Sequence, residues 1–335
     1  MIGRRFQVNL IRLYRCVGRV VAFVFAFALV AHGDESATSI QFKQDDDQGQ
    51  LQILIGGREA LVYVYGKEID LPHFYPVRSP SGKSMTVQQT EPYPHHRSFW
   101  FADTVQLKSQ RQVSFYNALY SGVGDRKNPK PPFLDHIRHV AITGKRDGDK
   151  EAELDLKLIW EMDAGRIPVL DETRSLRVVA LGEGEYFLDL RFTLAASYGD
   201  VTFRSDAVHY AWPFIRLNDD FNAKNGGLLV NSTGQTGQTN TNMKVAEWVD
   251  FSRAGGPDSE GLAMFGHPAN EQPHAWLTRD YGCIGPRRIE AKSGKPFTLN
   301  RGESIQTRVG VLVHKGDVKS GRVAKRYQAY ANGRL

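Results

Sequence analysis

Apolar and polar positions alternate with a period of two along most of the chain. Leu51, Ile53 and Ile55 alternate with polar or glycine positions, and every second residue from Tyr186 to Leu194 is apolar. This period is typical of a β-strand with one buried face. The pattern therefore predicts β-strands along almost all of the chain after residue 33.

The alternation recurs between Leu154 and Leu158, a few residues after the turn signal Asp147-Gly148. Two alternating runs joined by such a turn predict a β-hairpin over residues 138–160. Further turn signals separate other strand-like runs. Many strands at short intervals, almost without crossover helices, favour an antiparallel sandwich over a parallel sheet.

The end of the chain has a different period. Val323, Tyr327 and Tyr330 share one side of a helix, so a C-terminal helix is expected over residues 317–332. We find no internal repeat and no domain boundary in the sequence. The predicted fold is all-β: one large antiparallel β-sandwich domain over residues 34–335, which includes the C-terminal helix.

The N-terminal segment predicts export. Its first 19 positions hold five arginines and no acidic residue, an apolar run follows over Val20–Ala31, and small residues lie just before Asp34. This composition is typical of a signal peptide, here residues 1–33, and implies a periplasmic or extracellular protein. The alternative is an uncleaved anchor, but a run of about 12 residues is short where a spanning helix needs about 20.

Signal removal changes the charge balance. The full chain has 43 Lys and Arg against 37 Asp and Glu, and the loss of five arginines leaves 38 against 37. A nucleic-acid partner is therefore not expected. No apolar run of about 20 residues follows, so no membrane span is expected after signal removal. Cys283 remains as the one cysteine, which rules out an internal disulfide.

Two neighbouring histidines precede an aromatic run. On a regular strand His95 and His96 would point to opposite faces, so one at most would face a pocket. Pro94 allows the alternative of an irregular loop, in which this restriction fails. The remaining alternative is one core histidine and one exposed histidine. Arg97 is expected either to bind a ligand through its planar fork or to pair with an acidic neighbour.

A third histidine lies in an aromatic setting. His209 is close to Trp212 and Arg216, which is consistent with either an acid/base in an aromatic site or a histidine in a core cluster. Glu247 adjoins an indole at Trp248. It is therefore a candidate general base, with a surface position on an edge strand as the alternative.

Further polar residues follow within a short stretch. Pro268 makes a rigid turn that would present His267 and Asn270 at a strand end. Arg279 and Tyr281 share a face if their segment is a strand. Motifs of serine hydrolases, nucleotide-binding loops, zinc proteases and paired-cysteine metal sites are absent from the sequence.

Several segments together carry a family resemblance. They read, in order, PHHRSFWFA (94–102), DAVHYA, LLVNSTG (228–234), EWVDFS, GLAMF, HPANEQPHAW and RDYG. The chain resembles a bacterial, planctomycete-type family of exported proteins that has carried the label "methane oxygenase PmoA" and is otherwise of unknown function. The resemblance covers most of residues 70–315.

The resemblance implies a sandwich of the galactose-mutarotase type and an association with polysaccharide degradation. Methane chemistry is disfavoured, because the oxygenase subunit of that name spans membranes repeatedly. The chain departs from the family where the usual D-H-P-H-H-R-G is replaced by the segment from Pro92 to Ser98, and a later G-x-D-F-W element is missing. If the lost residues are catalytic, this copy is altered or inactive.

These observations favour a carbohydrate-active protein, expected to be an enzyme with an aromatic-lined cleft that uses histidine and a carboxylate for acid-base chemistry. Hydrolysis, elimination and epimerisation all remain open, and no cofactor or metal ligand is assigned. The candidate catalytic residues are His96, His209, Glu247 and Glu172. The candidate substrate-binding residues are His95, Arg97, Trp212, Arg216, His267, Asn270, His274, Trp276, Arg279 and Tyr281.

Two alternatives belong to other classes. One is a non-catalytic glycan-binding module that uses the same cleft. The other is a metal-dependent oxidoreductase with ligands drawn from His95, His96, His209 and His267. For the leading hypothesis we expect the histidines and Arg279 to converge on one pocket, because a sandwich brings distant strands together.

Overall fold

The structure is a computed structural model that describes residues 35–204, 211–253, 259–270, 275–287 and 296–335. The chain divides after residue 33 into two units, of which residues 34–335 contain everything described below. Among the described residues, no helix is long and apolar enough to cross a membrane.

The first sheet has eight strands, and all neighbours in it are antiparallel. In spatial order they are β1 (Ile40–Asp45), β2 (Gln50–Ile55), β3 (Arg58–Val64), β4 (His73–Val77), β5 (Phe99–Trp100), β15 (Phe214–Arg216), β20 (Cys283–Arg287) and β19 (Ala275–Arg279). Strands from residues 40–100 therefore meet strands from residues 214–287 at the boundary between β5 and β15.

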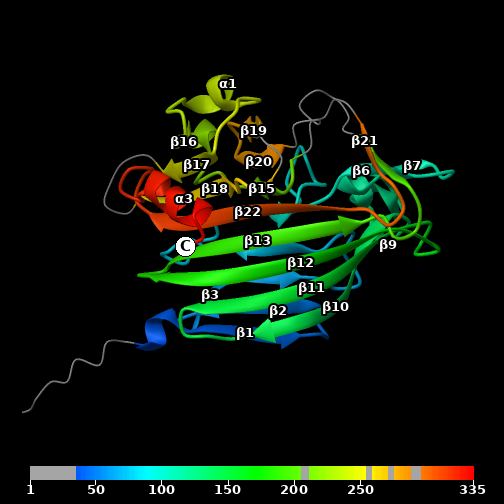
Figure 1. Cartoon of the computed structure of the whole chain (residues 1–335), viewed down its shortest axis with the longest axis horizontal. Helices are drawn as coiled ribbons and strands as arrows, with labels where there is room; N and C mark the ends of the chain where they lie inside the picture. Colours follow the sequence, from blue (N-terminus) through cyan, green and yellow to red (C-terminus); the bar gives the residue numbers. More distant parts are fainter. Residues whose placement is uncertain (1–34, 205–210, 254–258, 271–274, 288–295) are drawn as a thin grey trace, which may run out of the picture. The chain divides into compact units, whose positions relative to one another are not determined.

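The second sheet also has eight antiparallel strands, and its long members lie side by side in Figure 1. They are β10 (His136–Arg146), β11 (Glu151–Met162), β12 (Ile167–Gly182), β13 (Glu185–Ala195), β22 (Ser304–Lys315), β18 (Glu260–Gly266), β17 (Trp248–Arg253) and β16 (Gly227–Asn231). The expected hairpin is confirmed, because β10 and β11 pair across their intervening turn.

Smaller elements complete the domain. A four-stranded sheet consists of β21 (Phe297–Leu299), β14 (Val201–Phe203), β6 (Thr104–Leu107) and β7 (Gln112–Ser114), and a two-stranded sheet of β8 (Gly122–Val123) and β9 (Lys130–Phe133). The helical elements of the described residues are η1 (Glu35–Thr38), η2 (Phe115–Ser121), η3 (Ala223–Asn225), α1 (Gly237–Thr241) and α3 (Val323–Ala331).

Alternation along the central strands explains why the second sheet is covered on both faces. Leu188 and Leu190 of β13 belong to the large core between the sheets, whereas Phe187 belongs to a second apolar cluster with Tyr327 and Tyr330 of α3. Successive side chains of a strand point to opposite faces, so α3 covers the outer face of this sheet. The prediction of an antiparallel sandwich with a C-terminal helix is confirmed.

The helix itself is shorter than residues 317–332. It begins at Val323, because the preceding residues form a turn. The Asp317 carboxylate accepts hydrogen bonds from the backbone N–H groups of Lys319 and Ser320 and from the Ser320 hydroxyl. An Asp side chain that bonds to the backbone a few residues on is a common alternative to helix formation.

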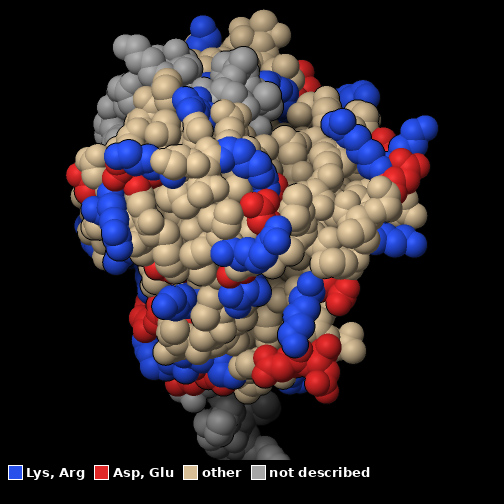
Figure 2. Space-filling model, turned by 90° about the vertical axis from the view of Figure 1, so that its right-hand side faces the viewer, with Lys and Arg blue, Asp and Glu red and all other residues tan. Residues whose placement is uncertain are grey.

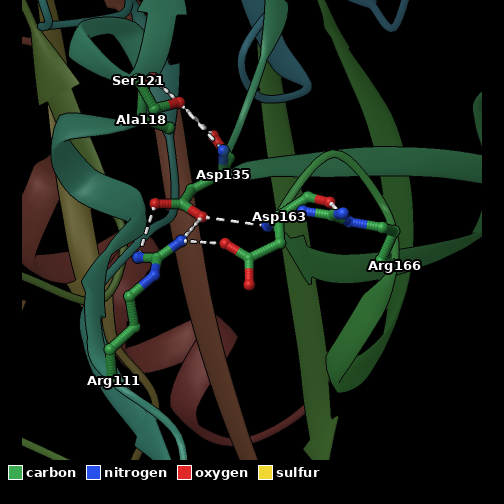
Figure 3. Close-up of polar contacts among 6 residues, drawn as sticks. All are labelled: Arg111, Ala118, Ser121, Asp135, Asp163 and Arg166. Carbon is green, nitrogen blue, oxygen red and sulfur yellow. Dashed lines mark hydrogen bonds and ion pairs between the residues drawn. The ribbon is translucent and has the colours of Figure 1, made fainter.

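A latch of two carboxylates and one guanidinium fixes the segment that carries η2 (Figure 3). Arg111 donates to both oxygens of Asp135, at 3.0 and 2.5 Å, and to Asp163 at 2.7 Å. Asp135 also exchanges backbone hydrogen bonds with the Ser121 hydroxyl at 2.9 and 3.0 Å. The latch therefore holds the chain before and after η2 against the turn between β11 and β12.

Charges of both signs are interspersed on one face of the molecule. Figure 2 shows Lys and Arg alternating with Asp and Glu on the side that lies at the right of Figure 1. Mixed charge agrees with the composition of residues 34–335, which hold 38 Lys and Arg against 37 Asp and Glu.

Candidate functional site

Residues from distant parts of the sequence meet beside the first sheet. The rings of Tyr93 and His96 stack with centroids 4.8 Å apart, and the rings of Tyr93 and Tyr281 lie 5.3 Å apart. The His95 ring is 4.6 Å from that of His96, and the guanidinium carbon of Arg216 lies 4.3 Å from the Tyr281 ring centroid. We call these five residues the aromatic–guanidinium cluster.

The two histidines reach the cluster because their segment is not a strand. The N–H of Tyr93 donates to the carbonyl of Thr90 at 2.9 Å, and the N–H of His96 donates to that of Tyr93 at 3.0 Å. These are turn hydrogen bonds, so the alternation expected on a strand does not apply. The interpretation of the segment after Pro94 as an irregular loop is confirmed, and both imidazoles lie in one site.

Arg216 is positioned by strand register. Arg216 of β15 pairs with Cys283 of β20, which in turn pairs with Arg279 of β19. Residues directly opposite one another in antiparallel strands point to the same face. Arg216 and Arg279 therefore flank Cys283 on one face of the sheet, and Tyr281 lies in the turn between β19 and β20.

The floor of the cluster is aromatic. Phe214 precedes Arg216 by two residues and so shares its face. Trp100 pairs with Phe214 in the register, and their rings stack at 4.9 Å with an angle of 15°. The His96 ring lies 5.5 Å from Trp100. Phe214 and Trp100 are both buried.

His96 is neutral over the physiological pH range. Only 4% of it is exposed, and burial, followed by the charges of His95, Arg216 and Arg97, lowers its pKa to about 2. Its Nε2 lies 2.8 Å from the Tyr116 hydroxyl, whereas its Nδ1 has no hydrogen-bond partner among the described residues. Burial and Arg97 also lower the pKa of His95, to about 4. Both imidazoles can therefore act as neutral hydrogen-bonding groups.

Helix η2 supplies a wall that the sequence did not reveal. Tyr116 and Tyr120 lie on η2, and the Tyr120 hydroxyl is 3.1 Å from Nδ1 of His95. Arg126 lies over the Tyr120 ring, with its guanidinium carbon 5.2 Å from the ring centroid. The latch at Arg111 anchors this wall at both ends.

A pocket of about 360 Å³ adjoins the cluster at Arg216. Three carboxylates line it together with Arg216: Glu91, Asp219 and Asp220. All three are exposed. The volume falls in the range of roughly 300–1,000 Å³ that is usual for small-molecule sites.

Comparison with known proteins identifies the family. Residues 50–328 match the model of a family of unknown function, DUF6807. The chain belongs to this family. No curated protein matches the sequence.

Solved structures show only distant similarity to this family member. The GH36 α-galactosidases AgaB and AgaA from Geobacillus stearothermophilus are 10% and 8% identical, with TM-scores of 0.45 and 0.44 over 84% of this chain. The chain spans 42% and 41% of their lengths. The Slr1438 protein from Synechocystis sp. PCC 6803 is 14% identical, with a TM-score of 0.34 over 83% of this chain and 96% of that one.

Arg97 lies beneath the cluster and has a carboxylate partner. Its guanidinium donates to Oδ1 of Asp70 through Nε, at 3.1 Å, and through a terminal nitrogen. The Asp70 and Arg97 side chains are 0% and 4% exposed. The second terminal nitrogen donates to the carbonyl of Pro94 at 3.4 Å. Of the two expectations for Arg97, the structure shows pairing with an acidic neighbour.

His267 and Asn270 lie elsewhere in this protein. Asn270 exchanges two hydrogen bonds with the backbone of Arg308, at 2.7 and 2.9 Å, and Nε2 of His267 lies 3.1 Å from the Arg308 guanidinium. The His267 ring contacts Tyr330 of α3 at 5.1 Å. These contacts belong to the outer face of the second sheet. The structure therefore does not bring His267 and Asn270 to the cluster.

The two candidate carboxylates also lie away from the cluster. Glu172 is fully buried in β12, where its carboxylate accepts from the Trp160 indole at 2.7 Å and pairs with Arg174. Glu247 is exposed beside β17, and its backbone N–H donates to the Ser232 hydroxyl. Glu172 thus takes part in a structural ion pair, and Glu247 occupies the surface position considered as its alternative.

The indoles of the candidate set serve the core. The Trp212 indole donates to Asp103 at 2.7 Å, and that of Trp276 donates to the carbonyl of Ala246 at 2.7 Å. Both side chains are buried. Arg279, by contrast, is half-buried, and it donates to the Asn242 amide oxygen at 2.7 Å.

Two candidates, His209 and His274, lie outside the described residues. Within the described residues, no group of three or more His, Cys, Asp or Glu side chains is arranged to hold a metal ion. Of the candidate residues that the structure describes, it brings together five: His95, His96, Arg216, Arg279 and Tyr281.

Proposed function

We propose that this protein is a carbohydrate-active protein that binds a sugar against the aromatic–guanidinium cluster. The half-buried rings of Tyr93 and Tyr281 offer faces on which a sugar ring can stack. Arg216 and the neutral imidazoles offer donors and acceptors for hydroxyl groups. The adjoining pocket has the volume of a small-molecule site.

One observation carries the proposal. Nδ1 of His96 and Nε of Arg216 are both buried and lack hydrogen-bond partners in the described part of the chain. They lie in the same cluster, because Tyr93 stacks on His96, Tyr281 lies against Tyr93, and Arg216 lies over the Tyr281 ring. Each unpaired buried polar atom costs about 1–3 kcal/mol. A ligand that pairs with both atoms would recover this free energy.

The acid-base chemistry of the site falls to its carboxylates. A histidine with a pKa of about 2 is a weak base and has no proton to donate at neutral pH. If the protein is an enzyme, we propose that Glu91, Asp219 or Asp220 transfers the proton, since these three line the pocket. The neutral state of His96 also favours the alternative, a non-catalytic glycan-binding module that uses the same residues.

Substitution of Tyr281 tests sugar binding. We expect Tyr281→Ala to weaken the binding of any glycan found by array screening by about tenfold, since an aromatic contact contributes about 0.5–1.5 kcal/mol beyond its buried area. Tyr281→Phe keeps the ring and is expected to bind like the wild type. Tyr198, exposed beside β13, provides the control Tyr198→Ala.

Isothermal titration calorimetry gives the affinity, and a melting curve shows whether each variant is folded. Equal loss in Tyr281→Ala and Tyr198→Ala would reject the cluster as the binding site. Release of reducing ends, or of unsaturated or epimerised products, from a bound glycan would distinguish an enzyme from a binding module.

We also propose that the protein is exported after cleavage before Asp34, with residues 1–33 as the signal. The arginine-rich start and the short apolar run support this proposal. N-terminal sequencing of the exported protein should begin near Asp34, and a sequence that begins at Met1 would refute it. A sandwich of the galactose-mutarotase type is part of the proposal, whereas the chemistry of the label "methane oxygenase PmoA" is not.

A further inference from the structure

The guanidinium group of Arg216, in the cluster, differs from those of two other buried arginines, Arg97 and Arg174. Arg97 pairs with Asp70 and Arg174 pairs with Glu172, so each of these charges is neutralised where it is buried. Arg216 is 7% exposed and pairs with no carboxylate among the described residues. Its contacts are the backbone carbonyl and the ring of Tyr281.

A second unneutralised cation lies on the same face. Arg279 bonds to the Asn242 amide and to the carbonyl of Thr278, and it forms no ion pair within the described chain. It flanks Cys283 on the side opposite Arg216, so the two backbones are two strand spacings, about 10 Å, apart. The guanidinium carbon of Arg216 lies 4.3 Å from the Tyr281 ring centroid, and Arg279 ends β19, two residues before Tyr281.

The carboxylates of the adjoining pocket do not neutralise these cations. Glu91, Asp219 and Asp220 are exposed, and none of them forms an ion pair with Arg216 among the described residues. Asp219 accepts a hydrogen bond from Asn222 at 2.8 Å. Exposed charges stay hydrated and are screened, whereas a buried guanidinium acts through a lower dielectric. The site therefore retains positive charge at its base.

We propose, on the basis of the sugar-binding function above, that the ligand is an acidic sugar whose carboxylate is bound by Arg216 and Arg279 while its ring lies against Tyr281. The planar guanidinium matches a carboxylate with two parallel hydrogen bonds, and Nε of Arg216 is free to donate one of them. A buried cation without a counter-ion is costly, and a uronate would supply that counter-ion.

Matched pairs of ligands test the inference. Oligosaccharides of galacturonate, glucuronate and mannuronate are each compared with the same preparation after chemical reduction of the carboxylates to primary alcohols. The reduced ligand keeps the ring, linkage and length and loses only the charge. Calorimetry with the full-length protein should show binding of at least one acidic ligand that is about tenfold or more tighter than that of its reduced form.

Two arginine variants and one control locate the effect. We expect Arg216→Gln and Arg279→Gln each to weaken binding of the acidic ligand by about tenfold more than binding of the reduced ligand, so that the preference for the acidic form is lost. Arg279 is half-buried, so its variant keeps the test valid if Arg216→Gln does not fold. Arg191→Gln, at an exposed position of β13, is the control and should bind like the wild type.

The outcomes separate this inference from the proposed function. Equal affinity for acidic and reduced ligands would overturn the acidic-sugar inference and leave sugar binding intact. Preference for the acidic form that persists in both arginine variants would overturn the assignment of the carboxylate site. Failure to bind either form, with the array also negative, would overturn the proposed function itself.

Discussion

The buried ion pair beneath the cluster makes a quantitative prediction about stability. Asp70→Asn keeps the shape of the side chain but leaves the Arg97 guanidinium, 4% exposed, without its counter-ion. Removal of one partner from a buried pair typically costs 3–5 kcal/mol, because the other charge stays buried and uncompensated. We therefore expect Asp70→Asn to lower the free energy of unfolding by about 3–5 kcal/mol.

An exposed pair supplies the control. Lys108 and Asp200 are 2.9 Å apart, but their side chains are 73% and 31% exposed. Pairs of this kind contribute about 0.2–1 kcal/mol, so Lys108→Gln should lower the free energy of unfolding by no more than that. Urea unfolding followed by circular dichroism measures both variants.

The result bears directly on the role of Arg97. If Asp70→Asn costs no more than Lys108→Gln, the buried pair does not stabilise the fold and the reasoning is refuted. In that case Arg97 would again be a candidate residue for ligand binding. A large loss of stability would instead agree with a role beneath the site, where Arg97 supports the carbonyl of Pro94.

Two further predictions concern the outer face of the second sheet. Burial lowers the pKa of His314, but the charge and hydrogen bond of Asp250 and the carbonyl of Lys315 outweigh it and raise the pKa above its usual value of about 6.5. The stabilisation by this pair is therefore full below about pH 6.5 and is lost as the pH rises through the folded-state pKa of His314. The urea midpoint of the wild type should decline across that window, whereas the midpoint of His314→Gln should not. The same pH dependence of the midpoint in both proteins would contradict this. Tyr330→Ala removes a fully buried ring from the contact of α3 with the sheet, so we expect it to lower the free energy of unfolding by about 3–5 kcal/mol in the same assay. A loss below about 1 kcal/mol would argue against tight packing of α3 on the sheet.

Much of the fold was predictable because most strands have one face in the core. Leu154, Leu156 and Leu158 are all buried in β11, which is the pattern that defines register and face. The start of α3 was less predictable, because the Asp317 turn competes with helix formation through a local side-chain contact. The alternation of apolar and polar residues gives no information about hydrogen bonds of this kind between a side chain and the nearby backbone.

The candidate site was predictable only in part. His95, His96 and Tyr281 stood out through residue type and do meet in space. His267 stood out for the same reason and lies against α3, because composition does not say which face of a sheet a turn serves. The carboxylate of Glu172 is two residues from Arg174 on one strand, so this pairing on a shared face was readable from strand period.

The tyrosines of η2 escaped notice for a different reason. Tyr116 and Tyr120 belong to a short 3-10 helix, which has no hydrophobic period long enough to recognise. Their place beside the histidines depends on contacts across the chain, such as Arg111 with Asp163. Contacts between residues that are distant in the sequence can be recognised only in the structure.

The Arg111 latch has a consequence for affinity. Ligand binding often orders side chains and loops, at about 0.5–1.5 kcal/mol for each flexible side chain that becomes fixed. The segment that carries Tyr116 and Tyr120 is tied down before any ligand arrives, by Arg111 on one side and Asp135 on the other. Its conformational entropy has already been lost during folding, so a ligand that contacts this wall does not have to order it.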